Sequence, residues 1–254
     1  MKTAYLGPEG SYSSLAARKL CPTAEYLPRK SFYAAVSCVL ACEADCAVLP
    51  VENTLQGAVA QNLDLLYASA ELFAVKEYLL QIDHRLIFRR GVNLSRIERV
   101  FSHEQAILQC GKFLSENLPQ AKIVYTDSTA ESLSVMQKET DAGIVGAHMA
   151  REGYELSAEN IADEKKNFTH FLLVKRGEEH LPVHSGRVYF AASCPHEPGA
   201  LLKMLQILAV YDLNMTKIES RPKKDSPGEY NFFIEFEGDI AANGVRAALS
   251  RLQE

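Results

Sequence analysis

The chain has 254 residues, 47% of them hydrophobic and 23% charged, which is typical of a soluble globular protein with a core of its own. A net charge of -5 argues against nucleic-acid binding, because a phosphate-binding surface usually carries a basic surplus. The start, M-K-T-A-Y-L-G-P-E-G, lacks the apolar run of a signal peptide, and no long apolar stretch follows it, so we expect a cytoplasmic protein of one or two domains.

The first 175 residues alternate short apolar strands with amphipathic helices. Such alternation indicates βαβ units and mainly parallel sheets, so we predict an α/β fold. The predicted strands cover residues 2–6, 46–50, 97–101, 122–126 and 141–146. The predicted helices cover residues 11–20, 31–42, 103–114, 129–138 and 147–153.

The six cysteines are expected to be reduced thiols. Cys38 and Cys42 lie four residues apart on the predicted helix 31–42, and Cys46 begins the next strand. No histidine accompanies them at a zinc spacing, so we interpret them as small buried residues and predict neither a metal nor a cofactor.

The composition changes after residue 175. Residues 176–186 are polar and predict a linker. Strands are then predicted at 187–193, 214–221 and 229–237, with helices at 198–211 and 241–254 and a turn at 222–228. This βαββα order is a ferredoxin-like unit (βαββαβ) without its last strand. About 70 residues form a small core, so docking or self-association is expected.

Five strand-to-helix junctions carry small or hydroxyl residues. They read G-P-E-G-S, P-V-E-N-T-L-Q-G, F-S-H-E-Q, T-D-S-T-A and I-V-G-A-H. Helix N-termini at the carboxyl ends of parallel strands bind anions, but plain helix capping selects the same residue types. Neither G-x-x-x-x-G-K-[ST] nor G-x-G-x-x-G is present, so a nucleotide phosphate is not indicated.

Motifs along nearly the whole chain resemble those of the monofunctional bacterial prephenate dehydratases with a C-terminal ACT regulatory domain. The motifs are G-P-E-G-S-Y-S-S-L-A-A, L-P-V-E-N-T-L-Q-G-A-V, S-H-E-Q-A-I-L-Q-C, D-S-T-A, N-F-T-H-F, G-A-L and M-T-K-I-E-S-R-P. Each fragment alone is weak, but their common order is specific. The resemblance implies that prephenate loses carbon dioxide and water to give phenylpyruvate, in phenylalanine biosynthesis and under feedback by phenylalanine.

The resemblance also implies an architecture. A two-lobed catalytic domain like a type-II periplasmic binding protein would cover residues 1–177, with lobe one at 1–77 and 168–177 and lobe two at 78–167. An ACT domain would cover 187–254 without its final strand. The family implies a homodimer or homotetramer. Two alternatives stay open: an arogenate dehydratase, and a non-catalytic amino-acid-sensing binding protein.

Thr169 lies in N-F-T-H-F at the start of a predicted strand. Packing within a strand and a proton-transfer role for its hydroxyl explain a threonine there equally well. The family's essential threonine, in T-R-F, carries over to Thr169 and implies that it is the catalytic proton donor. The resemblance places substrate binding at the junctions and at the position after the threonine: Ser11, Asn53, Thr54, Ser102, Gln105, Ser128, Thr129 and His170. The basic pair His84 and Arg85 could meet a carboxylate, but alternation on a half-exposed strand explains both equally well.

His170 stands where the family has an arginine. Arginine grips a carboxylate with two parallel bonds, which histidine cannot do, so we expect weaker substrate binding or an altered pH profile. In the C-terminal region the family's phenylalanine-binding segments carry over to two stretches and one asparagine: Gly199, Ala200, Leu201, Asn214, Glu219, Ser220, Arg221 and Pro222. A plain helix start and a plain strand end are the alternatives for these two stretches.

Overall fold

The computed structural model describes residues 1–177, 184–223, 226 and 228–253. Internal contacts divide the chain into two units. The first holds Met1–Gly57 and Glu77–Val174, and the second holds Ala58–Lys76 and Lys175–Glu254. No helix of the described part is long and apolar enough to cross a membrane.

A six-stranded sheet carries the N-terminal strands. Its order is β2-β1-β3-β11-β5, with β4 paired to β3. β1 is parallel to β2 and β3, whereas β11 runs antiparallel to β3. The strands are β1 (Lys2–Leu6), β2 (Glu25–Arg29), β3 (Cys46–Asn53), β4 (Gly57–Ala58), β5 (Leu72–Gln81) and β11 (Phe168–Arg176). Helices α1 (Tyr12–Leu20) and α2 (Phe32–Leu40) contact β1 and β3, and serines cap their N-termini.

A five-stranded sheet follows in the order β10-β6-β9-β7-β8. β7 is parallel to β8 and β9, and β6 is antiparallel to β9 and β10. The strands are β6 (His84–Arg89), β7 (Arg99–Ser102), β8 (Lys122–Tyr125), β9 (Asp141–Gly146) and β10 (Tyr154–Leu156). The helical segments are η1 (Leu94–Arg96), α4 (Glu104–Gln109), α5 (Gly111–Asn117), α6 (Ser132–Val135) and η2 (Ala147–Met149).

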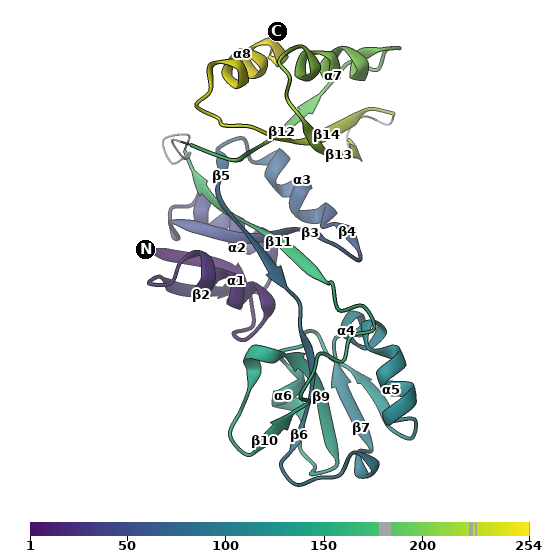
Figure 1. Ribbon diagram of the computed structural model, residues 1–254. Coiled ribbons are helices and arrows are strands. Elements are labelled where there is room, and N and C mark those ends of the chain that lie inside the picture. Colours follow the sequence, from purple (N-terminus) through teal and green to yellow (C-terminus); the bar gives the residue numbers. More distant parts are fainter. Residues whose placement is uncertain (178–183, 224–225, 227, 254) are drawn as a thin grey trace. The chain divides into compact units, whose positions relative to one another are not determined.

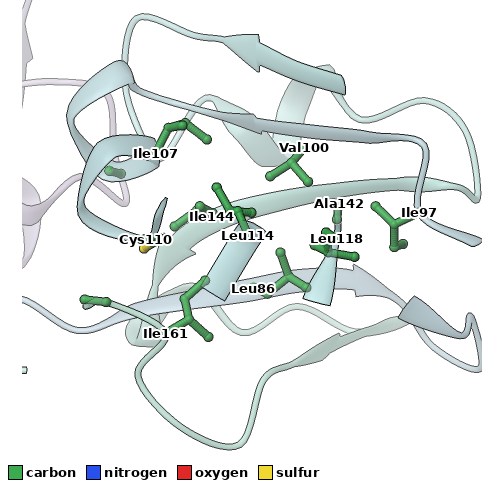
Figure 2. Packing of buried hydrophobic residues seen from close by; sticks show 12 residues of the cluster. Leu86, Ile97, Val100, Ile107, Cys110, Leu114, Leu118, Ala142, Ile144 and Ile161 are labelled. Carbon is green, nitrogen blue, oxygen red and sulfur yellow. The ribbon is translucent and has the colours of Figure 1, made fainter. Parts of the chain in front are cut away.

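Buried apolar side chains hold α4 and α5 on this sheet. Ile107 and Cys110 meet Leu86 of β6 and Ile144 of β9 in one cluster, which Figure 2 shows. Because Ile107 and Cys110 flank Gln109, the last residue of α4, the core fixes where that glutamine lies.

The second unit contains α3 (Ala60–Ala68) and a three-stranded antiparallel sheet in the order β12-β14-β13. The bounds are β12 (Arg187–Ser193), β13 (Met215–Pro222), β14 (Tyr230–Glu237), α7 (Ala200–Val210) and α8 (Asn243–Leu252), as Figure 1 labels them. Ile234 and Phe236 face the helical core. Tyr67 of α3 makes an edge contact with Phe233 at 6.1 Å between ring centroids.

Several predicted helices are shorter than expected. The helix 103–114 is interrupted at Cys110, which divides it into α4 and α5. The helix 129–138 is reduced to α6, because the Asp141 carboxylate accepts the N–H groups of Gln137 and Lys138 and turns the backbone. The helix 147–153 is only the short η2, which ends at the extended Ala150.

Other expectations also need correction. The two larger sheets are mixed and not mainly parallel, because β11, β6 and β10 run against their neighbours. The pattern did not predict β2 or α3. Cys38 and Cys46 are buried as expected, but Cys42 is exposed, at a φ of 58° just beyond α2. The predicted linker and the turn 222–228 lie partly outside the described residues.

Asp141 is a buried carboxylate that organises the start of β9. Arg99 binds it through two nitrogens, each 2.8 Å from a carboxylate oxygen. Burial alone would raise the pKa of Asp141, but the hydrogen bonds from Arg99 and from the N–H groups of Lys138 and Gln137 outweigh it and hold the pKa below its usual value. The ionised form therefore stabilises the fold above the unfolded pKa, and that contribution is lost as the pH falls through the folded pKa.

Asp141→Asn should lower the free energy of unfolding at pH 7 by about 1.5–3 kcal/mol, the range for hydrogen bonds to charged groups. The deficit should shrink below about pH 4, where the carboxylate of the unfolded wild type becomes protonated while the folded one is still held ionised. Denaturant unfolding at pH 7 and pH 3 measures both values, with the exposed Asp127→Asn as control. An equal deficit at both pH values would contradict this account.

Candidate active site

Thr169 lies on β11 opposite Asn53 of β3. The antiparallel register pairs Thr169 with Asn53 and His170 with Glu52, before a bulge between His170 and Phe171. Consecutive side chains of a strand point to opposite faces, so Thr169 and His170 face different sides of the sheet. The Thr169 side chain is half-buried.

Two backbone N–H groups fix the orientation of the Asn53 amide. Leu55 N and Gln56 N donate to Asn53 Oδ1 at 3.0 and 3.2 Å. The amide nitrogen therefore faces the other way, and Nδ2 lies 3.0 Å from Thr169 Oγ1 and 2.7 Å from Asn167 Oδ1. Thr169 Oγ1 thus accepts a hydrogen bond, and within the described residues its own proton has no acceptor. The hydroxyl can give that proton to a ligand.

The amide chain continues beyond Asn53. Asn167, which is fully buried, donates from Nδ2 to Gln109 Oε1 at 3.0 Å. His84 Nε2 lies 2.9 Å from the same oxygen. Burial lowers the pKa of His84, against the opposing influence of Gln109 and Asp83, so the imidazole stays neutral at neutral pH. The groups that adjoin Thr169 through this chain are therefore uncharged.

Three of the predicted substrate-binding serines have local partners. Ser11 Oγ accepts from Ser14 N at the start of α1, and Ser128 Oγ accepts from Glu131 N. The buried Ser102 donates from Oγ to the Ile144 carbonyl at 2.8 Å. The capping alternative therefore describes Ser11, whereas Ser128 closes the turn before α6, and substrate contacts by these serines stay a prediction.

The remaining predicted substrate contacts lie in different places in the structure. Thr54 Oγ1 accepts from Phe168 N at 3.0 Å and so braces the residue before Thr169. Gln105 is exposed on α4, and Thr129 is half-buried before α6. His170 Nε2 lies 2.8 Å from Glu77 Oε2 on β5, with 8% of His170 exposed. Of the predicted set, Asn53 hydrogen-bonds Thr169, Thr54 binds the residue before it, and the His170 side chain lies on the other side of the sheet.

The predicted phenylalanine contacts fall on three places in the second unit. Gly199 precedes α7 with a φ of 83°, a conformation that favours glycine, and Ala200 and Leu201 begin the helix. Asn214 Nδ2 donates to Glu237 Oε2 at 3.0 Å. On β13, Glu219, Ser220 and Pro222 pair with β14, and Arg221 Nε lies 3.3 Å from Asp64 Oδ1 of α3.

Sequence reasoning missed Gln109 and Asn167 and left His84 open. Gln109 lies one helical turn after the predicted Gln105, and the burial of its neighbours Ile107 and Cys110 could have indicated the inward-facing glutamine. Asn167 was part of N-F-T-H-F and precedes Thr169 by two residues, so both side chains of this strand entry face the same side.

The fold and the site together define an α/β protein with a threonine hydroxyl held by neutral amides. The described neighbours of Thr169 Oγ1 include a donor but no base, which suits general-acid chemistry better than attack by the hydroxyl. The family model described as prephenate dehydratase matches residues 3–179. The chain belongs to the prephenate dehydratase family.

Curated relatives carry two related activities. A prephenate dehydratase of Amycolatopsis methanolica is 36% identical over 99% of this chain and 84% of its own length. An arogenate dehydratase/prephenate dehydratase of Arabidopsis thaliana chloroplasts is 34% identical over 100% of this chain and 69% of its own. The family that the motifs resembled is thereby confirmed.

Solved structures share the mixed α/β fold. A prephenate dehydratase of Arthrobacter aurescens in complex with L-Phe matches with a TM-score of 0.90 at 32% identity, covering 100% of this chain and 86% of that one. The quorum-quenching acylase GqqA matches with a TM-score of 0.83 at 30% identity, covering 99% and 92%. The same fold is therefore found with a second chemistry.

Proposed function

We propose that this chain converts prephenate to phenylpyruvate and that Thr169 protonates the departing hydroxyl. The single observation that carries the proposal is the hydrogen bond from Asn53 Nδ2 to Thr169 Oγ1 at 3.0 Å. That bond leaves the threonine proton available and supplies a donor for any negative charge that develops on Oγ1. Family membership supports the choice of substrate.

The reaction breaks two bonds of prephenate. The electron pair of the bond to the ring carboxylate enters the ring as carbon dioxide leaves, and the ring carbon–hydroxyl bond breaks. Thr169 gives its proton to the departing oxygen, which leaves as water, and solvent returns a proton to Oγ1. Asn53 stabilises the alkoxide character that Oγ1 gains in the transition state. General-acid catalysis of this kind typically contributes about 10²–10⁴-fold.

Neutral groups suit a substrate that must lose a carboxylate. A salt bridge to the ring carboxylate would stabilise the ground state and oppose decarboxylation. The proposed contacts are hydroxyls, amides and helix N-termini, namely Ser11, Asn53, Thr54, Ser102, Gln105, Ser128 and Thr129. We place them on the two facing lobes of a domain like a type-II periplasmic binding protein. His170, whose side chain faces the other side of the sheet and meets Glu77, would support the strand that carries Thr169 instead of contacting the substrate.

One other substrate and one other reaction compete with prephenate dehydration. Arogenate offers the same leaving groups and differs at its side-chain amine, and one relative carries both activities in its name. An acylase would need Thr169 as nucleophile with a base on Oγ1, and the described residues place a donor there.

Purified protein should be assayed for phenylpyruvate from prephenate, phenylalanine from arogenate, and hydrolysis of an N-acylated quorum signal. We expect the highest kcat/KM on prephenate. Higher kcat/KM on arogenate would reassign the substrate, and acyl hydrolysis alone would overturn the reaction class. Binding of phenylalanine with no turnover of any of the three would favour a sensor.

We assign residues 187–254, which belong to the second unit, to an ACT-type regulatory domain. Phenylalanine would bind at Gly199–Leu201, Asn214 and Glu219–Pro222, between subunits of a homodimer or homotetramer in the cytoplasm. The Arg221–Asp64 ion pair supports a route to the catalytic residues, because α3 connects β3, which carries Asn53, with β5, which carries Glu77. Such coupling requires phenylalanine to bind two states of the protein unequally.

Asp64→Asn tests this route. The substitution removes the charge that Arg221 meets, so we expect turnover without phenylalanine to be unchanged and the phenylalanine concentration for half-inhibition to shift by about fivefold or more. Inhibition curves measure the shift. Glu159→Gln, which breaks the exposed pair with Lys165, is the matched control. Identical inhibition of Asp64→Asn and wild type would contradict the route.

A further inference from the structure

We propose that His84 is a positioning residue for Thr169, acting through a directed chain of amides. His84 begins β6 and only 3% of it is exposed. It touches neither Thr169 nor Asn53, and three hydrogen bonds through Gln109 and Asn167 separate it from Asn53. The inference rests on the proposed function, because it concerns the same hydroxyl.

The direction of every bond in this chain follows from the backbone at one end. Leu55 N and Gln56 N can only donate, so Asn53 presents its oxygen to them and its NH₂ group to Asn167. Asn167 must therefore accept with Oδ1 and donate with Nδ2, and Gln109 must accept with Oε1. An oxygen acceptor at Gln109 requires a proton on His84 Nε2. This series of hydrogen bonds assigns the neutral His84 tautomer with its proton on Nε2, and the assignment does not depend on the pKa of His84.

Tyr12 of α1 holds the other side of the imidazole. Its single hydroxyl proton goes to the Asp83 carbonyl at 2.9 Å, and with Nε2 protonated, His84 Nδ1, 3.3 Å away, can only compete for that same proton. The two rings also make an edge contact at 5.8 Å between centroids. His84 N further donates to Asn160 Oδ1 at 3.2 Å, so both the ring and the backbone of His84 are held in place.

The consequence for Thr169 is geometric. Gln109 Oε1 accepts from both His84 and Asn167, so loss of the His84 donor leaves the Gln109 amide held on one side only. Asn167 is fully buried, and its Nδ2 group donates to that Gln109 amide. Rotation of Gln109 would free Asn167, and Asn53 Nδ2, which the backbone keeps aimed at this side, would lose its acceptor at 2.7 Å beside Thr169 Oγ1. Because His84 lies outside the proposed substrate contacts, the effect should fall on kcat and leave KM nearly unchanged.

Three substitutions separate the donor from its surroundings. His84→Gln keeps an N–H donor near the position of Nε2, His84→Asn keeps an amide near Nδ1 only, and His84→Leu removes both. We expect kcat on prephenate to fall by about 10–100-fold in the Leu and Asn variants, as for a small misplacement of a reacting group. His84→Gln should recover most of the loss. His184→Leu, at a histidine of the second unit paired with Asp239, is the control.

Repeating the His84 substitution in the Thr169→Val variant distinguishes a loss of hydroxyl positioning from a general loss of structure. In Thr169→Val, the additional His84→Asn substitution should cause no further loss, because the hydroxyl that it orients is absent. Equal kcat for the Gln and Asn variants, a loss expressed only in KM, or a full loss repeated in the Thr169→Val background would overturn the proposal. If His84→Leu does not fold, the Gln and Asn pair decides. Absence of turnover by the wild type would instead refute the proposed function.

Discussion

Thr169→Val is expected to lower kcat for prephenate by about 10²–10⁴-fold, the usual contribution of a general acid. Valine keeps the branched shape of threonine on β11 and removes the oxygen that accepts from Asn53 and donates to the departing hydroxyl. KM should change little, since the substrate carboxylates are held elsewhere. Initial rates of phenylpyruvate formation measure both constants.

Two controls accompany this substitution. Thr169→Ser keeps the hydroxyl and should retain most of the activity. Thr140→Val removes an exposed hydroxyl that donates to Glu98, so it should match the wild type. Turnover by Thr169→Val near the wild-type rate would show that the threonine serves packing alone.

Asn53→Asp is expected to lower kcat by about 10²–10³-fold, as for loss of a donor to developing negative charge. Aspartate can still accept from Leu55 N and Gln56 N, so the turn after β3 is preserved. Its second oxygen, however, faces Asn167 Oδ1, where only a donor fits, and would take the Thr169 hydroxyl proton instead of donating to Oγ1. The free energy of unfolding should also fall by about 1–3 kcal/mol.

The control for Asn53→Asp is Asn117→Asp, at an exposed asparagine that donates to the Phe113 carbonyl. It introduces the same charge away from the site and should leave kcat unchanged. Kinetics and denaturant unfolding together separate catalysis from stability. An active Asn53→Asp enzyme would mean that Thr169 does not need the amide donor.

Strands with a clear apolar run were predictable from the sequence. β1 and β12 occupy the expected residues, and Thr3, Ala4 and Tyr5 of β1 are buried in succession, as expected for a strand covered on both faces. β2 escaped prediction since E-Y-L-P-R contains a proline, which β2 tolerates as the outermost strand of its sheet. The shortened α6 follows from Asp141, whose hold on Gln137 and Lys138 depends on a tertiary contact with Arg99.

The site was predictable only in part. Motif order identified Thr169 and Asn53, which the register of β3 and β11 brings together. Gln109 was missed because Gln105 and Gln109 lie on neighbouring turns of one helix, and only the packing of Ile107 and Cys110 decides which one faces inward. For His170, the sequence indicated the residue but not its partner. Its partner Glu77 is 93 residues away in sequence, and no local pattern indicates that pair.

In the proposed mechanism, Asn53 and Thr169 act as one unit on the departing hydroxyl. A double-mutant cycle of Thr169→Val and Asn53→Asp, measured as kcat on prephenate, tests it most directly. We predict that the double variant is no slower than Thr169→Val alone, because the amide has no hydroxyl left to support. Losses that multiply in the double variant would contradict the claim and show that the two residues act separately.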